Sequence, residues 1–306
     1  MKRRSGARIG GALLAVVLAG TAGGPHLVPA SAAEAAPRSY QAVGVIREIK
    51  PADRTLVIRH EAIGDYMGAM TMPFTVKDPK AMAGLVVGDK VAFRLTVTKT
   101  DGWIDQIKVL EEGGAVAPPP TVPSVRRVRL VDELKEGDLL PDYPFVNELG
   151  RSIRLSQFKG QALGLTFIYT RCPYPTFCPR MSNNFAEACR RLAALEHGPT
   201  NWHLLSLSFD PQVDTPRKLR HYARSFDYDP VHWSFVTGAI IDIDAITEQF
   251  GVTFARDGQG FSHNVRTVVV DARGRVQHIY VGNEWKVEDF VTALVKAAGA
   301  PSSAGR

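Results

Sequence analysis

Short runs in which apolar and polar residues alternate fill the chain between residues 40 and 110. The runs are rich in β-branched residues and are separated by turn signals, which is typical of half-buried strands. The predicted strands are 40–49, 54–63, 70–76, 90–97 and 103–111. Five short strands in so small a segment predict an all-β barrel of the OB type over residues 40–110.

The hydrophobic pattern changes in the second part of the chain. Nearly continuous apolar runs at 162–170 and 202–209 indicate buried strands, and 265–281 has the pattern of a hairpin around a Gly turn. Helices are predicted at 179–196, 215–226, 242–251 and 286–299. Strands that alternate with helices predict an α/β domain of thioredoxin-like type over residues 129–300.

Two further segments separate or precede these domains. Residues 111–128 are dominated by Pro and Gly and predict an extended linker. Residues 1–32 begin with basic residues, continue with an apolar run too short for a comfortable membrane span, and end on the small-residue pattern Ala30-Ser31-Ala32. We therefore expect a signal peptide and an exported protein; an uncleaved first segment would instead attach the chain to the membrane.

The charge balance changes once that segment is set aside. The net charge of the whole sequence is +6, but residues 1–32 carry four basic residues and no acid, so the remainder carries +2. A chain so close to neutrality gives no electrostatic reason to expect a nucleic-acid partner. The 45% hydrophobic content is that of an ordinary globular protein.

Three cysteines occur in the whole sequence, and two of them, Cys172 and Cys178, are close together among prolines. They follow a buried strand and precede a helix with Pro179 in its first turn, where a thiolate is stabilised by the helix N-terminus. A structural disulfide, a redox switch, a nucleophile and a metal site all use such a pair. Export and the scarcity of other cysteines argue against a disulfide-stapled scaffold. Cys189, on the apolar face of the next helix, is interpreted as a core thiol.

The spacing narrows the alternatives. Five residues separate the two cysteines, whereas disulfide oxidoreductases prefer two. Thr170 does not complete the Pro-x-x-x-Thr-x-x-Cys pattern of peroxidases. His263 stands before a later strand, where thioredoxin-type oxidoreductases place a cis-proline. Asp210 and Asp214 in "LSFDPQVDTP" are interpreted as turn or capping residues that could also tune the site.

The Cys-Pro…Cys-Pro loop, "LSFDPQVDTP" and the lone His before "VRTVVVDARGRV" resemble the Sco/SenC family of copper proteins. The resemblance implies a copper site formed by Cys172, Cys178 and His263. It also implies a role toward the CuA site of cytochrome c oxidase, either delivering copper or reducing its cysteines. The chain departs from the family's usual spacing of three residues between the cysteines. Two thiolates and one imidazole suit Cu(I) on chemical grounds alone, and oxidation of the pair to a disulfide would abolish the site.

The first domain carries a cluster of soft ligands. Three of the six methionines of the chain, Met67, Met70 and Met72, fall within six residues, and His60 precedes them. Thioether sulfur suits Cu(I), although methionines also fill gaps in cores. The stretch resembles the CusF family of periplasmic copper proteins, which implies His60, Met70 and Met72 as ligands. Met67 occupies the place of that family's metal-covering tryptophan. This leaves two alternatives, Met67 as a third thioether ligand or the adjacent Tyr66 as the residue that shields the ion.

These features predict an exported, periplasmic copper metallochaperone with a redox-active cysteine pair. Its client would be the CuA-bearing subunit of cytochrome c oxidase or another exported cuproprotein, and a thiol reductant would keep the cysteines reduced. The metal is expected to be Cu(I), with Cu(II) as the alternative oxidation state. Two other functions stay open: an enzymatic thiol–disulfide reductase for a cuproprotein, and a periplasmic copper-tolerance buffer.

Overall fold

The computed structural model describes residues 36–113, 131–257 and 260–299. The predicted signal peptide, residues 1–32, and residues 114–128 of the predicted linker lie outside the described residues. The described residues fall in one compact unit, in which two separate sheets carry two hydrophobic cores. Within the described ranges, no helix is both long and apolar enough to cross a membrane.

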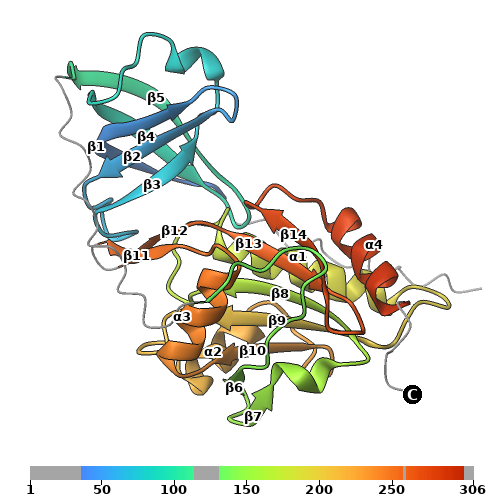
Figure 1. The fold of residues 1–306 in the computed structure, drawn as a ribbon. Coiled ribbons are helices and arrows are strands. Elements are labelled where there is room, and N and C mark those ends of the chain that lie inside the picture. The colour runs from blue at the N-terminus through green and yellow to red at the C-terminus, as the bar shows by residue number, and fades with distance from the viewer. Residues whose placement is uncertain (1–35, 114–130, 258–259, 300–306) are drawn as a thin grey trace, which may run out of the picture. The chain divides into compact units, whose positions relative to one another are not determined.

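The N-terminal sheet has five antiparallel strands in the order β3-β2-β1-β4-β5 (Figure 1). Their bounds are β1 Arg38–Lys50, β2 Thr55–His60, β3 Met70–Thr75, β4 Lys90–Val97 and β5 Gly102–Glu111, and a short 3₁₀ helix spans Pro79–Met82. All five strands were predicted near these positions. The closed OB-type barrel is not confirmed, because in the described part of the chain β3 and β5 pair only at one parallel bridge, Val76–Ile104.

Strand β3 shows why this sheet positions a site. Met70, Met72 and Phe74 are buried on its inner face, while Thr71 and Pro73 are partly exposed, as expected of a strand with one face on the core. In the register of β2 and β3, Met70 lies opposite His60. The sequence pattern therefore turns His60, Met70 and Met72 to one side of the sheet.

The second sheet has seven strands in the order β14-β13-β8-β9-β10-β6-β7, with β8, β9 and β10 parallel at its centre and antiparallel strands beside them (Figure 1). The bounds are β6 Pro144–Asn147, β7 Ser152–Arg154, β8 Ala162–Ile168, β9 Trp202–Ser208, β10 Trp233–Thr237, β13 Arg266–Val270 and β14 Val276–Val281; a 3₁₀ helix spans Leu155–Phe158. Every residue of the three central strands is buried. Continuous apolar runs of this kind are typical of parallel strands covered on both faces.

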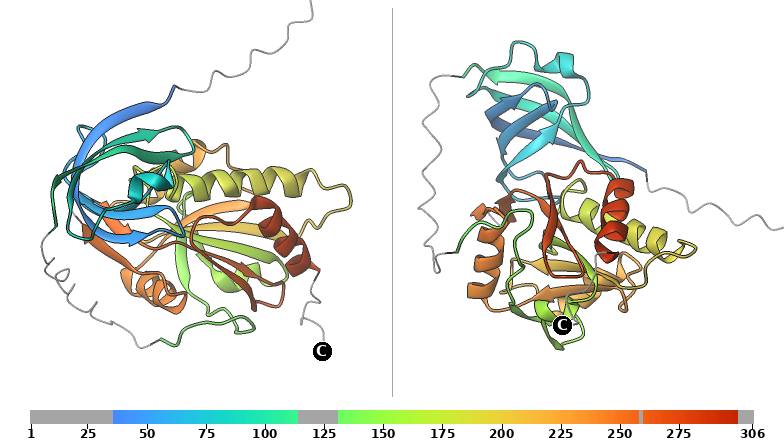
Figure 2. Two further views of the ribbon diagram at one scale, coloured as in Figure 1. Left: turned by 90° about the horizontal axis from the view of Figure 1, so that it is seen from above. Right: turned by 45° about the vertical axis from the view of Figure 1, so that its right-hand side comes forward.

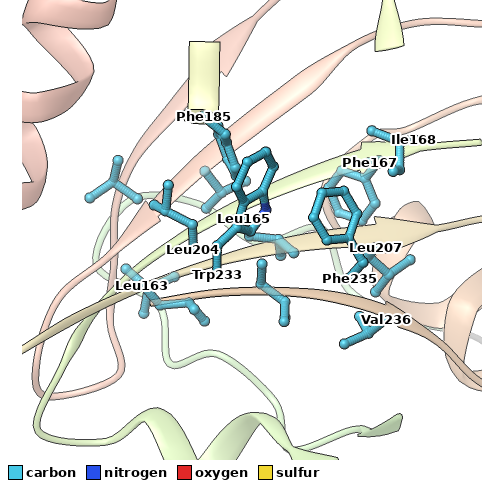
Figure 3. Close-up of a cluster of buried hydrophobic side chains, with 14 of the residues drawn as sticks. Leu163, Leu165, Phe167, Ile168, Phe185, Leu204, Leu207, Trp233, Phe235 and Val236 are labelled. Atoms are coloured by element: carbon cyan, nitrogen blue, oxygen red, sulfur yellow. The ribbon is translucent and has the colours of Figure 1, made fainter. Parts of the chain in front are cut away.

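Helices cover both faces of this sheet. The bounds are α1 Cys178–Ala193, α2 Pro216–Arg224, α3 Ile240–Gln249 and α4 Val287–Ala298. Phe185 of α1 stacks on Phe290 of α4 with ring centroids 5.2 Å apart, so these two helices lie together. Phe167 of β8 instead contacts Phe250, next to α3, on the opposite face. Figure 2 shows orange α3 and red α4 on the two sides of the sheet, and Figure 3 shows Phe185 and Trp233 in the buried cluster, where their ring centroids lie 5.9 Å apart.

The α/β thioredoxin-like prediction is confirmed in its order of strands and helices, and Thr215 caps α2 as expected, since its hydroxyl accepts a hydrogen bond from the Lys218 N–H. Sequence analysis missed β6, β7 and β10. It also missed the hairpin of β11, Phe254–Asp257, and β12, Gly260–His263. The Asp257–Gly258 dipeptide between β11 and β12 is a hairpin signal that could have revealed the pair.

Gly164 in β8 offers a test of how tightly α4 seats on the sheet. A Cβ atom there would lie 2.7 Å from both Leu204 Cδ2 and Phe290 Cζ. We expect Gly164→Ala to destabilise the protein by about 1–3 kcal/mol through overpacking, measured as a lower midpoint of urea unfolding. Gly299→Ala is the control, because its Cβ would meet nothing closer than 3.7 Å. Equal midpoints for the two variants would contradict this packing.

Candidate metal centre

The cysteine loop joins the end of β8 to the start of α1. Cys178 is the first residue of α1, and Pro179 occupies the first turn, where its missing N–H costs no helical hydrogen bond. Cys172 is partly exposed and Cys178 is buried; both thiols are free. The predicted position of the pair, after a buried strand and at a helix N-terminus, is thus the observed one.

His263 ends β12 and brings a ring nitrogen to the pair. The ligand atoms of Cys172, Cys178 and His263 all lie within 4.8 Å of one another. Nε2 of His263 lies 3.8 Å from Sγ of Cys178. These three are the one such group of Cys, His and acidic side chains found among the described residues. The structure therefore brings His263 to the cysteine pair, although it follows Cys178 by 85 positions in the sequence.

The tautomer of His263 is determined by its backbone partner. Nδ1 lies 2.8 Å from the carbonyl oxygen of Asn264, and a carbonyl only accepts, so Nδ1 carries the proton. In the neutral ring, Nε2 then presents a lone pair toward the cysteines. Fixing one nitrogen so that the other is free to ligate is the usual arrangement of metal-binding histidines.

Aromatic rings surround His263 and limit its movement. Tyr169 and Phe177 lie edge-on to the imidazole at centroid distances of 5.6 and 5.7 Å, and Phe209 lies at 5.2 Å. Tyr169 and Phe209 are almost fully buried. The centre is thus apolar around its donors, which reduces competition from water.

Two buried carboxylates, those of Asp210 and Asp214, bind the start of the cysteine loop. Asp214 accepts hydrogen bonds from the Thr170 N–H at 2.9 Å and from the hydroxyl of Ser208. Asp210 pairs with Arg171 at 2.8 Å. Beyond the turn or capping roles that the sequence suggested, Asp214 binds Thr170 and Asp210 binds Arg171, the two residues that immediately precede Cys172.

The two thiols differ in acidity. Burial acts to raise the pKa of Cys172, but the hydrogen bond with Cys178 and then the interaction with His263 outweigh it and lower that pKa well below the usual thiol value. Burial, and then the hydrogen bond and negative charge of Cys172, raise the pKa of Cys178 well above the usual value. Of the two thiols, Cys172 is therefore the one that ionises more readily, although Cys178 is the residue at the helix N-terminus.

The N-terminal sheet brings a second set of soft donors together. His60 and Met70 are direct partners across β2 and β3, and Met72 follows on the same face. Side chains of such partners lie about 5 Å apart at Cβ. All three are buried, with exposed fractions of 1%, 6% and 7%. Met67 is also buried and joins the same apolar cluster.

His60 repeats the arrangement of His263. Its Nδ1 donates to the carbonyl of the next residue, Glu61, at 2.7 Å. Its Nε2 is buried and has no hydrogen-bond partner. An unpartnered buried nitrogen costs free energy unless something binds it, so this atom fits a metal ligand. Tyr66 stacks on Tyr40 at 4.7 Å, and its hydroxyl donates to the carbonyl of Pro173.

The other histidines among the described residues and Cys189 take no part in either set. Cys189 is buried in the core, and burial raises the pKa of its thiol to about 12. His203 is buried against Ser234, while His278 pairs with Glu136 at the surface. The interpretation of Cys189 as a core thiol is consistent with this position.

Two family models match separate segments of the chain. The family model of SCO1/SenC matches residues 131–299, more than half of the chain. The chain belongs to the SCO1/SenC family. A second model, that of the copper binding periplasmic protein CusF, matches residues 39–109. This SCO1/SenC chain therefore carries a CusF-like domain ahead of its family domain.

Several relatives resemble this SCO1/SenC protein. The SCO1 protein homolog of Bacillus subtilis is 26% identical over 160 residues, which are 51% of this chain and 80% of the relative. BsSco, a member of the Sco family of cytochrome c oxidase assembly proteins, is 24% identical, with 56% and 99% of the two chains covered and a TM-score of 0.47. ScoI of Bradyrhizobium japonicum, solved with copper bound, is 19% identical, with 52% and 99% covered and a TM-score of 0.43.

Sequence analysis of this SCO1/SenC chain missed two residues beside the centre. Tyr174, between the two cysteines, is 2% exposed, and Asp257 at the end of β11 accepts a hydrogen bond from Thr71. Tyr174 could have been singled out, because it is an aromatic residue in the proline-rich loop between the cysteines. Nothing in the sequence around Asp257 indicated its contact with Thr71.

The unequal acidity of the thiols in this SCO1/SenC protein predicts selective alkylation. The thiolate is the reactive form, so Cys172 should react with iodoacetamide well below the usual thiol pKa, while Cys178 stays protonated and slow. Peptide mass analysis of the reduced, metal-free chain across a pH series measures both rates. His263→Ala should move the midpoint of Cys172 to higher pH, and Cys189 is the internal unreactive control. Faster modification of Cys178 would contradict the assignment.

Proposed function

We propose that this chain is an exported copper metallochaperone that loads a cuproprotein. The observation that carries the proposal is the convergence of Cys172, Cys178 and the unprotonated Nε2 of His263 within 4.8 Å. Two thiolates and one imidazole are soft to borderline ligands that favour copper over hard cations. Membership in the SCO1/SenC family supports the same metal.

The site suits a carrier because its affinity depends on the redox state. Both thiols of the pair must be reduced and must lose their protons for copper to bind. Oxidation to a disulfide removes two of three ligands at once, which releases the ion. The pKa of Cys172 is lowered and that of Cys178 is raised, so Cys172 loses its proton more readily than Cys178 when Cu(I) binds.

The N-terminal domain is proposed as the site that captures Cu(I), through His60, Met70 and Met72. The orphaned Nε2 of His60, the register that faces it to Met70, and the match to the CusF model support this assignment. Thioethers bind Cu(I) without losing a proton, so this site stays available when cysteines are oxidised. Met67 is the candidate fourth donor.

The client is proposed to be the CuA-bearing subunit of cytochrome c oxidase. BsSco belongs to a family of cytochrome c oxidase assembly proteins, and the sequence resemblance implies the same client. Residues 1–32 support export, which places the chain on the side of the membrane where such clients are metallated. A thiol reductant must regenerate the pair after each oxidation.

A thiol–disulfide reductase is the second candidate, and one specific observation favours it. A low-pKa cysteine beside a protonated one is what attack on a partner disulfide requires: Cys172 attacks, and Cys178 resolves the mixed disulfide. In that reaction two electrons leave the pair and reduce the partner's disulfide. His263 separates the two functions because only the chaperone needs it as a ligand.

The proposed ligands of the N-terminal site predict the copper stoichiometry. The reduced chain should bind two Cu(I) per molecule in anaerobic competition titrations, and Met70→Leu with Met72→Leu should bind one. Met82→Leu is the matched control, because Met82 is equally buried in the same domain but outside the ligand set. If the double variant still bound two Cu(I), Met70 and Met72 would be core residues and not copper ligands.

The proposed ligands of the second site predict the complementary loss. Cys172→Ala with Cys178→Ala should bind one Cu(I) per molecule, while the control Cys189→Ala should bind two. His263→Ala should weaken Cu(I) binding by about tenfold or more, the usual cost of losing one ligand group. Unchanged affinity in His263→Ala, together with continued reduction of a CuA-site disulfide, would favour the reductase over the chaperone.

A deletion strain separates the client-specific chaperone from a copper-tolerance buffer. Loss of the chaperone should lower cytochrome c oxidase activity at ordinary copper levels, and the wild-type gene, but not Cys172→Ala, should restore it. A copper-sensitive strain with normal oxidase activity would identify a buffer instead.

A further inference from the structure

The segment between the paired cysteines packs into the core of the N-terminal sheet. Tyr174 joins the cluster of buried residues of that sheet and lies edge-on to Phe74 at a centroid distance of 5.7 Å. Gly102, at the start of β5, leaves room for the ring: a Cβ there would lie 3.1 Å from it. Phe74 in turn lies edge-on to His60 at 5.5 Å. The cysteine loop and the proposed N-terminal ligands therefore share one apolar cluster.

Polar contacts from separate elements support the same docking. The hydroxyl of Tyr66 donates to the carbonyl of Pro173 at 2.7 Å, one residue after Cys172. The carboxylate of Asp257 in β11 accepts from the backbone N–H of Thr71 at 2.6 Å, one residue after Met70. Each contact lies next to a proposed copper ligand.

A third polar contact lies farther from the ligands. Arg180 of α1 contacts Asp101 of the N-terminal domain and Glu284 of its own domain, both at 3.2 Å. The guanidinium of Arg180 therefore forms one ion pair between the domains and a second ion pair, at the same distance, within its own domain.

The two ligand sets line the same cavity. A space of about 30 Å³ is bordered by Met70 and Met72 on one side and by Cys172 and His263 on the other, with Tyr169 and Phe177 among its walls. A cavity of this size holds a few waters at most. Gly260 allows the close approach, because a Cβ there would lie 3.0 Å from Cε of Met70.

We propose that residues 173–177 are a docking element that seats Tyr174 in the N-terminal domain and opens a direct passage for Cu(I) from Met70 to Cys172. The inference rests on the proposed function of the two sites. It gives the five-residue spacing between the cysteines a purpose, since Pro173 and Tyr174 make the docking contacts.

The transfer is an exchange of ligands without electron transfer. Cu(I) leaves the thioethers of Met70 and Met72 and the imidazole of His60, and binds the sulfurs of Cys172 and Cys178. Protons carried by the two thiols go to solvent, and copper stays Cu(I). Because both ligand sets line the same cavity, the ion can move between them without a separate passage through bulk water.

The test begins with the oxidised full chain, which has a Cys172–Cys178 disulfide, loaded with one Cu(I) under anaerobic conditions. A phosphine and bathocuproine disulfonate, a coloured Cu(I) chelator, are then added together. The phosphine gives two electrons to the disulfide and takes an oxygen from water. Protection of the thiols from iodoacetamide measures copper that reaches the cysteines, and colour measures copper lost to the chelator.

The wild-type chain should deliver most of its copper to the cysteines regardless of chelator concentration. Tyr174→Ala should lose about tenfold more copper to the chelator, because transfer then competes with escape into solvent. Asp101→Asn with Asp257→Asn weakens docking without altering a proposed ligand and should shift the partition in the same direction. Glu284→Gln is the matched control, since it removes the other partner of Arg180, and should behave as wild type.

Small-angle X-ray scattering should show a larger radius of gyration for Tyr174→Ala, and circular dichroism should show unchanged secondary structure. An equal copper partition in the wild type, Tyr174→Ala and the double variant would overturn the docking proposal. Failure of the oxidised wild-type chain to bind Cu(I) at all would instead overturn the proposed N-terminal site. The two failures are therefore distinguishable.

Discussion

The geometry of the cysteine–histidine centre depends on the hydrogen bonds that the buried carboxylate of Asp214 accepts. This carboxylate accepts hydrogen bonds from Thr170, just beyond the end of β8, and from Ser208, at the end of the parallel neighbour β9. Hydrogen bonds to a buried charge are worth about 1.5–3 kcal/mol each, and a buried carboxylate without them is costly. The ends of two strands and the segment before α2 are thereby fixed together, two residues before Cys172.

Both proposed metal sites use the same device to prepare a histidine. His60 and His263 each donate Nδ1–H to the carbonyl of the following residue, which leaves Nε2 as the free donor. A neutral imidazole so oriented needs neither a proton loss nor a ring rotation to bind a metal. In His263 the aromatic walls add restraint, whereas His60 is held within a strand opposite Met70.

The cysteine loop combines two tasks that usually oppose each other. It must be stiff enough to hold two thiols near one imidazole, and its prolines restrict the backbone for that purpose. It also extends an aromatic side chain, Tyr174, into the neighbouring domain. Under the docking proposal, disulfide formation would alter this loop directly, so the redox state of the pair would be coupled both to copper affinity and to domain contact.

Local pattern was sufficient for most of the fold and for the identity of the donors. Alternation predicted all five N-terminal strands, and continuous apolar runs predicted β8 and β9, because strand period and burial are written into neighbouring residues. Unusual residue types, two cysteines among prolines and methionines beside a histidine, marked the candidate ligands. Short strands such as β10 and β12 were not predicted, because four or five residues are too few to show a clear hydrophobic period.

Only the tertiary structure decided which donors meet and in what state. The approach of His263 to Cys178, the opposite pKa shifts of Cys172 and Cys178, and the seat of Tyr174 depend on burial and on contacts that the sequence does not show. Composition and spacing report what a residue can do. Burial, hydrogen-bond partners and distance, which determine what it does, are properties of the packed chain.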